Sequence, residues 1–185
     1  MILVPNRRLV LTAAAASLLP LRQAVAQTAA AGGDWLAMVK AHHALVAKSF
    51  DKLLASDKST YLTREQLVKT IGYELTAHSV AEENVIYPAI AMMGTMTDAD
   101  KLYLDQAHAK VMNAQLEMQA EMKEKGSWKD AAMSLQQAVL RHAKEDEEGR
   151  IYPALKAKLD PAMNAMLTTK YKREFDSVKL TRAVA

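Results

Sequence analysis

Two segments of the chain carry histidine, acidic and tyrosine residues in nearly the same order. One runs from His78 to Pro88 and the other from His142 to Pro153, and both end in Ile-Tyr-Pro. In the first segment Glu82 follows His78 by four residues, so the two side chains share one face of a helix. Two helices that each offer an imidazole and a carboxylate can build a metal site in the core of a helical bundle. The repeat therefore predicts a metal site.

The second segment offers two candidates for its carboxylate ligand. Alignment on Ile-Tyr-Pro matches Glu82 with Glu147, which follows His142 by five residues. Side chains five residues apart on an α-helix point about 140° apart, so Glu147 converges with His142 if the helix widens locally, as in a π-bulge. Asp146 lies four residues after His142 and needs no widening. We favour Glu147, because Gly149 is compatible with such an irregularity, and keep Asp146 as the alternative.

From Asp34 onward the sequence predicts helices and no strand, because its apolar residues recur at steps of three and four. The expected helices cover about 34–56, 63–93, 97–125 and 127–160, with a shorter one over about 161–178. Thr63, with Gln66 three residues on, is the expected cap of the second helix, and Thr97 or Asp98 that of the third. Long helices joined by short loops predict an all-α, up-down-up-down four-helix bundle with a short C-terminal helix.

Each long helix places one histidine in the apolar stripe that should face the core. These histidines are His43, His78, His108 and His142. The stripe of the third helix is expected to contain Leu104, His108, Val111, Met112, Gln115, Met118 and Met122. Burying four histidines and two carboxylates without a cation would cost several kcal/mol per uncompensated ion. A domain has a net stability of only about 5–15 kcal/mol, so a bound cation is predicted.

The first helix contains two adjacent histidines that compete for the role of ligand. Its apolar stripe consists of Leu36, Val39, Val46, Phe50 and Leu53. Position 43 continues this stripe, whereas position 42 lies beside it. His43 is therefore the expected ligand, and His42 is expected to flank the ligands.

The pattern resembles the bacterial branch of the hemerythrin-like (HHE cation-binding) family. The resemblance covers about Trp35 to Leu155 and rests on the four stripe histidines, Glu82 and the two acidic-pair-to-Tyr-Pro segments. It implies two non-haem iron ions in the core of the bundle, bridged by two carboxylates and an oxo or hydroxo group. The implied terminal ligands are His43, His78, His108 and His142, and the implied bridges are Glu82 and Glu147 (or Asp146).

One position departs from the oxygen-carrying members of that family. Their third helix continues as His-x3-His, whereas here Met112 follows His108 by four residues. A thioether is a poor ligand for ferric iron, so four histidines and two carboxylates are expected, which favours reactivity over reversible oxygen carriage. The resemblance implies O2 or a related small oxidant, NO or peroxide, as the ligand. The alternative is a non-redox bundle that holds iron, zinc or manganese in a structural or storage role.

The N-terminal sequence is typical of an export signal. Arg7 and Arg8 precede an apolar run, and Ala24-Val25-Ala26 offers small residues for cleavage. The arginine pair also resembles a twin-arginine signal. We expect a signal peptide over 1–26, a flexible leader over 27–33, the bundle over 34–160, and a C-terminal helix and tail over 161–185. This predicts a periplasmic protein that does not insert into the membrane after cleavage.

Composition excludes several classes of partner and site. The chain has 24 basic and 21 acidic residues, and loss of Arg7, Arg8 and Arg22 with the signal would equalise the two. Nothing in that balance predicts nucleic acid as a partner. The chain contains no cysteine, which excludes thiolate-ligated iron–sulfur, blue-copper and zinc sites. The expected partner is a small diatomic or peroxide ligand, and the sequence does not identify the electron donor.

Overall fold

The computed structural model describes residues 33–56, 60–121 and 127–178. The described residues form one compact unit. The signal peptide expected over 1–26, and the expected leader apart from Gly33, lie outside the described residues.

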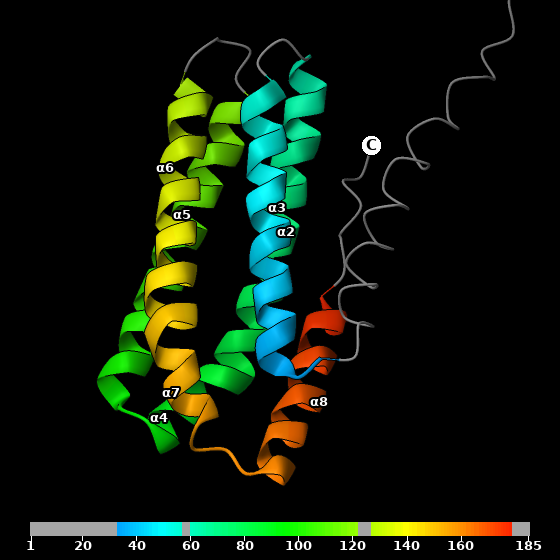
Figure 1. The fold of residues 1–185 in the computed structure, drawn as a ribbon. Helices are drawn as coiled ribbons and strands as arrows, with labels where there is room; N and C mark the ends of the chain where they lie inside the picture. The colour runs from blue at the N-terminus through cyan, green and yellow to red at the C-terminus, as the bar shows by residue number, and fades with distance from the viewer. Residues whose placement is uncertain (1–32, 57–59, 122–126, 179–185) are drawn as a thin grey trace, which may run out of the picture. The chain divides into compact units, whose positions relative to one another are not determined.

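Four helical rods and one additional helix make up the described fold (Figure 1). The first rod is α2 (Trp35–Ala55), and the third is α5 (Met96–Glu121). The second rod joins α3 (Tyr61–Ala81), the π-helical η2 (Glu82–Ile86) and α4 (Tyr87–Met93). The fourth joins α6 (Ser127–Arg141), the π-helical η3 (His142–Ile151) and α7 (Tyr152–Lys156), and α8 (Pro161–Ser177) follows. Neighbouring rods pack in a closed ring, and the described residues contain no strand, so the predicted four-helix bundle is confirmed.

Two helices begin earlier than the capping residues in the sequence suggested. Thr60, not Thr63, caps α3, because its Oγ1 accepts a hydrogen bond from the Thr63 N–H at 3.4 Å. At the start of α5, the Oγ1 of Thr95 accepts from the Asp98 N–H at 3.1 Å. In both cases a threonine caps the amide three residues further on. The residues chosen from the sequence therefore lie in the first turn of the helix.

The expected apolar stripe of the third helix was wrong. Leu104 is 70% exposed and Met118 is 62% exposed, and Val111, Gln115 and His108 are exposed as well. The buried positions of α5 are Ala99, Leu102, Gln106, Leu116 and Ala120. Large apolar side chains lie around much of this helix, so two stripes compete in its sequence. The correct one includes alanine and a glutamine, which apolar periodicity does not select.

The interior divides into an apolar half and a polar half. The apolar half lies where the C-terminal part of α2 packs near the start of α6. Its fully buried side chains include Phe50, Leu53, Ile71, Leu116 and Leu135. The polar half lies toward α4 and α7 and contains the histidines and carboxylates of the two repeated segments. Burial of large apolar side chains contributes roughly 1.5–3 kcal/mol each, so the apolar half supplies much of the packing energy.

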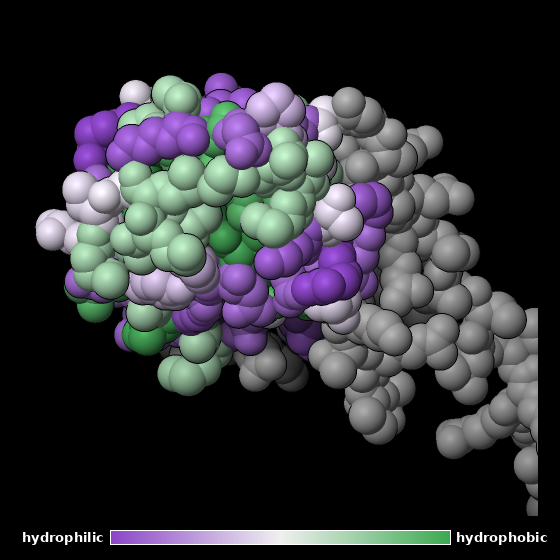
Figure 2. Space-filling view, turned by 90° about the horizontal axis from the view of Figure 1, so that it is seen from below, coloured by the Kyte–Doolittle hydropathy of each residue, from purple (hydrophilic) through white to green (hydrophobic). Residues whose placement is uncertain are grey.

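The end of the bundle near α4, α7 and the start of α8 presents a mildly apolar surface. Figure 2 shows pale green residues there, with hydrophilic ones around them. Met92, Met96 and Met166 are exposed. None of the described helices combines the length and the apolar character needed to cross a bilayer.

One acidic side chain is buried near the apolar half of the interior. Glu74 is 2% exposed, its Oε1 accepts a hydrogen bond from the Ser49 hydroxyl at 3.0 Å, and its Oε2 has no partner. Burial raises the pKa of this carboxyl to about 7. Because the folded pKa lies above the unfolded one, the folded state loses stability as pH rises from about 4.5 through 7.

We expect Glu74→Gln to stabilise the protein by roughly 2 kcal/mol at pH 8 and to have little effect at pH 5. The amide keeps the acceptor for Ser49 and removes the buried charge. Urea unfolding of the metal-free protein at both pH values measures this difference. Equal changes at pH 5 and pH 8 would contradict the assignment of a buried, ionising carboxyl.

Candidate metal centre

Two π-helical segments orient the side chains of the repeated motifs. The Tyr87 N–H donates to the Glu82 carbonyl, and the Tyr152 N–H donates to the Glu147 carbonyl, both across five residues. The widening expected at Glu147 is present, and η2 has the same feature, which was not expected from the sequence. A Cβ at Gly149 would lie 2.7 Å from the Lys144 carbonyl oxygen. Glycine at this position therefore permits the close backbone approach in the widened turn.

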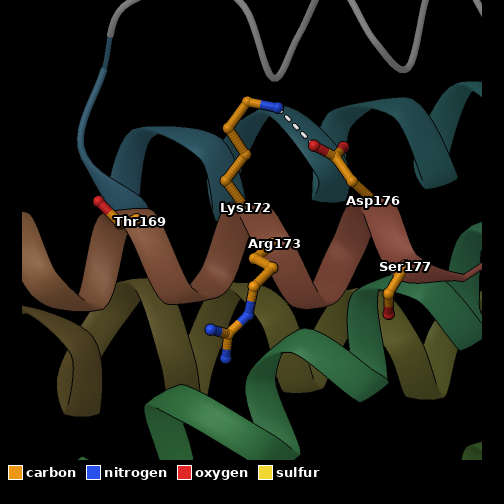
Figure 3. A pocket seen from close by; sticks show the side chains of 5 residues that line it. All are labelled: Thr169, Lys172, Arg173, Asp176 and Ser177. Atoms are coloured by element: carbon orange, nitrogen blue, oxygen red, sulfur yellow. Dashed lines mark hydrogen bonds and ion pairs between the residues drawn. The ribbon is translucent and has the colours of Figure 1, made fainter.

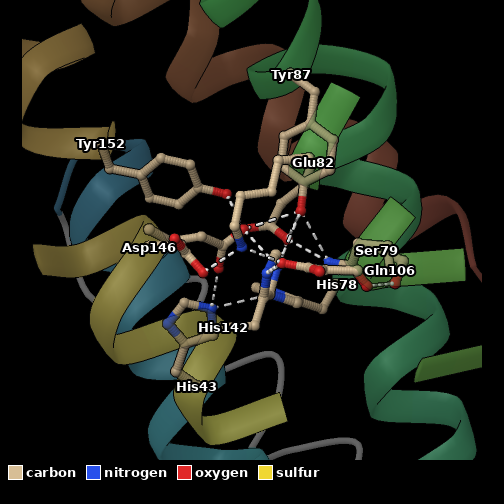
Figure 4. A network of polar contacts seen from close by, with 12 residues as sticks. His43, His78, Ser79, Glu82, Tyr87, Gln106, His142, Asp146 and Tyr152 are labelled. Atoms are coloured by element: carbon tan, nitrogen blue, oxygen red, sulfur yellow. Dashed lines mark hydrogen bonds and ion pairs between the residues drawn. The ribbon is translucent and has the colours of Figure 1, made fainter. Parts of the chain in front are cut away.

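Three imidazoles and two carboxylates converge in the polar half (Figure 4). The Nε2 atoms of His43 and His78 lie 3.0 Å apart. His78 Nε2 is 3.0 Å from Glu82 Oε2, and His43 Nε2 is 3.1 Å from Glu147 Oε2. The other oxygen of Glu147 lies 3.1 Å from His142 Nε2. Glu147 thus spans the space between His43 and His142, and both carboxylates are fully buried.

The second nitrogen of each of these imidazoles has a polar partner outside the cluster. His43 Nδ1 lies 2.7 Å from Glu148 Oε1, and His142 Nδ1 lies 3.1 Å from Asp105 Oδ2. His78 Nδ1 lies 3.2 Å from the Tyr171 hydroxyl. Such partners hold a histidine in the orientation and tautomer that direct Nε2 toward a metal.

Two tyrosines and a glutamine complete the polar network, and none of them was expected from the sequence to have a role. The hydroxyls of Tyr87 and Tyr152 donate to Glu147 Oε1 at 2.9 Å and 2.6 Å, and Tyr152 also donates to Glu82. Gln106 Nε2 donates to Glu82 Oε2 at 2.9 Å and to the Tyr87 oxygen at 3.0 Å. The repeated Ile-Tyr-Pro pointed to the tyrosines. No signal pointed to Gln106, because the register of its helix was misread.

Opposite charges stabilise each other inside the cluster. Burial opposes a charge on His43, but hydrogen bonds to Glu147 and Glu148 raise its pKa to about 9. Burial likewise opposes a charge on His142, and the Glu147 carboxylate raises its pKa to about 9. Although burial alone would raise the pKa of Glu147, His142 and His43 hold it well below its usual value. Burial raises the pKa values of Tyr87 and Tyr152 well above their usual range, so both phenols are neutral donors.

Two residues expected among the ligands lie outside the cluster. Asp146 is partly exposed, pairs with Lys101 at 2.6 Å, and lies 3.5 Å from Arg150. Together with Asp105 and His142 it forms a second, more exposed group whose donor atoms lie within 4.8 Å of one another. Lys101 also binds Asp105 at 2.7 Å, so this ammonium neutralises the neighbouring group of acidic side chains. The expectation that His108 is buried with the other histidines was wrong, because its side chain is exposed. The α5 residues that contact the cluster are Gln106, at Glu82, and Asp105, at His142.

His42 is buried, but on the side of the cluster that faces α8. Its ring stacks on Phe175 at a centroid distance of 3.8 Å, and its Nδ1 lies 2.9 Å from the Tyr171 hydroxyl. Burial and the neighbouring imidazoles of His78 and His43 lower its pKa to about 3, so His42 is neutral. His43 enters the cluster and His42 flanks it, as the apolar register of the first helix predicted.

A matched pair of variants tests whether His142 binds the metal and His108 does not. We expect His142→Gln to reduce metal affinity by about 100-fold or more, because it removes an inward-directed donor from the cluster. His108→Gln should leave affinity and stoichiometry unchanged, since an exposed side chain is replaced by another polar one. Metal titration monitored by calorimetry tests both. Equal loss of metal from the two variants would show that His108 is a ligand.

The buried cluster has the properties of a cation site. Oε2 of Glu147 is buried and accepts no well-aligned hydrogen bond, although His43 lies close to it. The Nε2 atoms of His43 and His78 lie 3.0 Å apart, so both can direct a lone pair to one point once His43 has lost its proton. Donor atoms of His43, His78, Glu82 and Glu147 all lie within 4.8 Å of one another. Imidazole and carboxylate donors suit iron, zinc or manganese, so the residues present fit a metal ion.

A small cavity adjoins the three imidazoles. It has a volume of about 40 Å³ and lies between α3, α5 and α6. Its lining includes His43, His78 and His142, apolar side chains such as Leu75 and Val139, and also His108. A second, open depression on the outer face of α8 is lined by Lys172, Asp176 and three other residues (Figure 3). Lys172 and Asp176 neutralise each other there, so nothing in that depression points to a ligand.

Met112 does not line the small cavity. Its side chain is partly buried and packs against the apolar core. The position four residues after His108, where an additional histidine ligand would lie, therefore contributes to core packing in this protein.

Comparison with known proteins agrees with this geometry. The family model of the hemerythrin HHE cation binding domain matches residues 35–155. The comparisons with curated proteins and with solved structures found no match. The matched range contains every residue of the buried cluster and ends before α8. The chain therefore belongs to the hemerythrin family of HHE cation-binding domains.

Proposed function

We propose that this protein is an exported metalloprotein with a non-haem di-iron centre that binds O2 or a related small oxidant, NO or peroxide. The observation that carries the proposal is the convergence of three Nε2 atoms and two buried carboxylates beside a small cavity. Such a centre supplies redox-active iron with coordination positions open to a small ligand.

The placement of Glu147 supports two metal positions. Its Oε2 lies 3.1 Å from His43 and its Oε1 lies 3.1 Å from His142, so one carboxylate faces two groups of donors. His43, His78 and Glu82 form one group. His142 stands on the other side, and the Tyr87 hydroxyl is 3.3 Å from its Nε2. A carboxylate that serves both sides is suited to bridging two ions.

The cavity beside the imidazoles supports a ligand of two or three atoms. Its volume of about 40 Å³ holds a few water-sized particles. Pockets for organic substrates are typically about 300–1,000 Å³. The lining combines imidazoles and aliphatic side chains with Asp105, Gln106 and Arg141, so it is the small volume that limits the ligand to a few atoms.

An alternative function is non-redox binding of a single ion, with a structural or storage role. The observation that favours it is the contribution of α5, which brings Gln106 and no imidazole to the cluster. His43, His78, Glu82 and Glu147 would then act as the four donors of one zinc or manganese ion.

Metal content and response to oxygen distinguish the two functions. Protein purified from its own host, or reconstituted with ferrous iron without oxygen, should contain two irons per chain. Exposure to O2 should then produce near-ultraviolet charge-transfer bands, which stopped-flow absorption spectroscopy can monitor. A colourless protein with one zinc per chain, inert to O2, NO and peroxide, would contradict the proposal and support the alternative.

The export part of the proposal rests on Arg7, Arg8 and the apolar run that follows them. We expect wild-type protein to be found in the periplasm with its N-terminus near residue 27, and Arg7→Lys with Arg8→Lys to remain in the cytoplasm. Cell fractionation followed by N-terminal sequencing measures this. Arg22→Lys, which keeps the arginine pair, is the control. Export of the double variant at the wild-type level would exclude the twin-arginine route.

A further inference from the structure

Helix α8 lies outside the residues matched by the family model, yet it packs beside the buried cluster of histidines and carboxylates. It contacts α2, α3 and η2. Its buried side chains are Leu167, Tyr171 and Phe175. Thr168 Oγ1 also accepts a hydrogen bond from the Trp35 N–H at 3.0 Å, which joins α8 to the start of α2.

The Tyr171 hydroxyl is the point at which α8 reaches the cluster. It lies 3.2 Å from His78 Nδ1 and 2.9 Å from His42 Nδ1, and Tyr171 is fully buried. A phenol hydroxyl has a single proton to donate and an oxygen that can accept a hydrogen bond. All three groups are satisfied when one imidazole donates to the tyrosine oxygen and the other accepts from the tyrosine O–H.

The direction of these two hydrogen bonds decides whether His78 can bind a cation. If His78 Nδ1–H donates to Tyr171, the lone pair of His78 Nε2 points at the cluster. If Tyr171 instead donates to His78 Nδ1, the Nε2 of His78 carries the proton and can only donate toward Glu82, 3.0 Å away. The first arrangement requires an acceptor for the Tyr171 O–H, and His42 Nδ1 lies 2.9 Å from that hydroxyl.

We propose that Tyr171 and His42 are positioning residues that hold His78 in its metal-binding tautomer, so that α8 forms part of the metal centre. His78 Nδ1–H donates to the Tyr171 oxygen, and the Tyr171 O–H donates to His42 Nδ1. His43 and His142 have carboxylates in the equivalent place, whereas His78 depends on a hydroxyl from a helix beyond the matched domain. This proposal rests on cation binding by the cluster and is independent of which small oxidant the centre binds.

Affinity for Co²⁺, measured by chelator competition on the full mature chain, tests the role of Tyr171. We expect Tyr171→Phe to weaken binding about 10–100-fold. Tyr73→Phe is the matched control, because its hydroxyl joins α3 to the end of α8 at the Val178 carbonyl, 3.4 Å away, and should change nothing. If wild-type protein binds no cation, the proposed function fails. If wild type and Tyr171→Phe bind equally well, the positioning role alone is wrong.

Two further measurements separate positioning from packing. His42→Phe keeps an aromatic ring against Phe175 but removes the acceptor, so it should weaken Co²⁺ binding and show little additional effect in combination with Tyr171→Phe. In zinc-loaded protein, the His78 Nδ1–H signal in ¹H–¹⁵N spectra should be protected from exchange in wild type and Tyr73→Phe and lost in Tyr171→Phe. Additive losses, or an unchanged His78 signal, would overturn the proposal.

Discussion

Glu147→Gln is expected to weaken metal binding by about 100-fold or more, whereas Asp146→Asn, at the preceding residue, should leave it at the wild-type level. Both substitutions replace a carboxylate by an isosteric amide. Glu147 is fully buried and places one oxygen beside His43 and the other beside His142. Asp146 is partly exposed and pairs with Lys101. The neighbouring positions therefore differ in function because η3 turns them to different sides.

Metal stoichiometry after reconstitution, with calorimetric affinity, measures the effect of both substitutions. Melting of the metal-free variants provides the folding control, since circular dichroism shows whether the bundle persists. If Asp146→Asn lost its metal and Glu147→Gln kept it, the π-helical register of the fourth rod would be wrong. Loss of metal from both variants, with both still folded, would extend the site to the surface group around Asp146.

The second large effect is a steep rise of metal affinity with pH. In the metal-free protein the pKa values of His43 and His142 are each raised to about 9, so both imidazoles are protonated at neutral pH. A cation binds Nε2 only after its proton leaves. Each displaced proton makes affinity rise about tenfold per pH unit, so two predict a rise of about 100-fold per unit between pH 6.5 and 8.5. Above about pH 9 the dependence should flatten.

Titrations with Co²⁺ across this pH range measure the slope, and calorimetry in two buffers counts the protons released. His142→Gln removes one of the two protonated imidazoles, so its slope should fall toward tenfold per unit. The same pKa values raised to about 9 contribute stability to the metal-free protein below about pH 6.5, and this contribution is lost as pH rises through 9. An affinity that does not change with pH would contradict the ion pairs with Glu147.

The bundle and most of the cluster were predictable because they follow from short-range regularities. A step of four residues between His78 and Glu82, and the apolar register around His43, place side chains by helix geometry alone. The repeated Ile-Tyr-Pro aligned Glu147 with Glu82 and so implied the widened turn in η3. In these cases the local period and the global fold require the same residues to face inward.

The remaining features depend on contacts that a single helix does not encode. In α5 two apolar stripes compete, and packing against the other rods turns Gln106 inward and His108 outward. The contribution of Tyr171 depends on where α8 lies after the chain turns at Asp160, which no periodicity reveals. The phenol hydroxyls of Tyr87 and Tyr152 resemble ordinary core aromatics in the sequence until the carboxylates beside them are located.

The division of the interior into an apolar and a polar half implies that the two halves open to solvent with different free energies. Amides around Phe50, Ile71 and Leu135 lie where packing is apolar, so they should exchange with solvent only when the whole bundle opens. Amides of η2 and η3 surround a buried cluster of ionised histidine and glutamate side chains and not an apolar core, so they should exchange through smaller, local openings. The chain can therefore fold first and acquire its metal afterwards, through fluctuations confined to one end of an otherwise closed bundle.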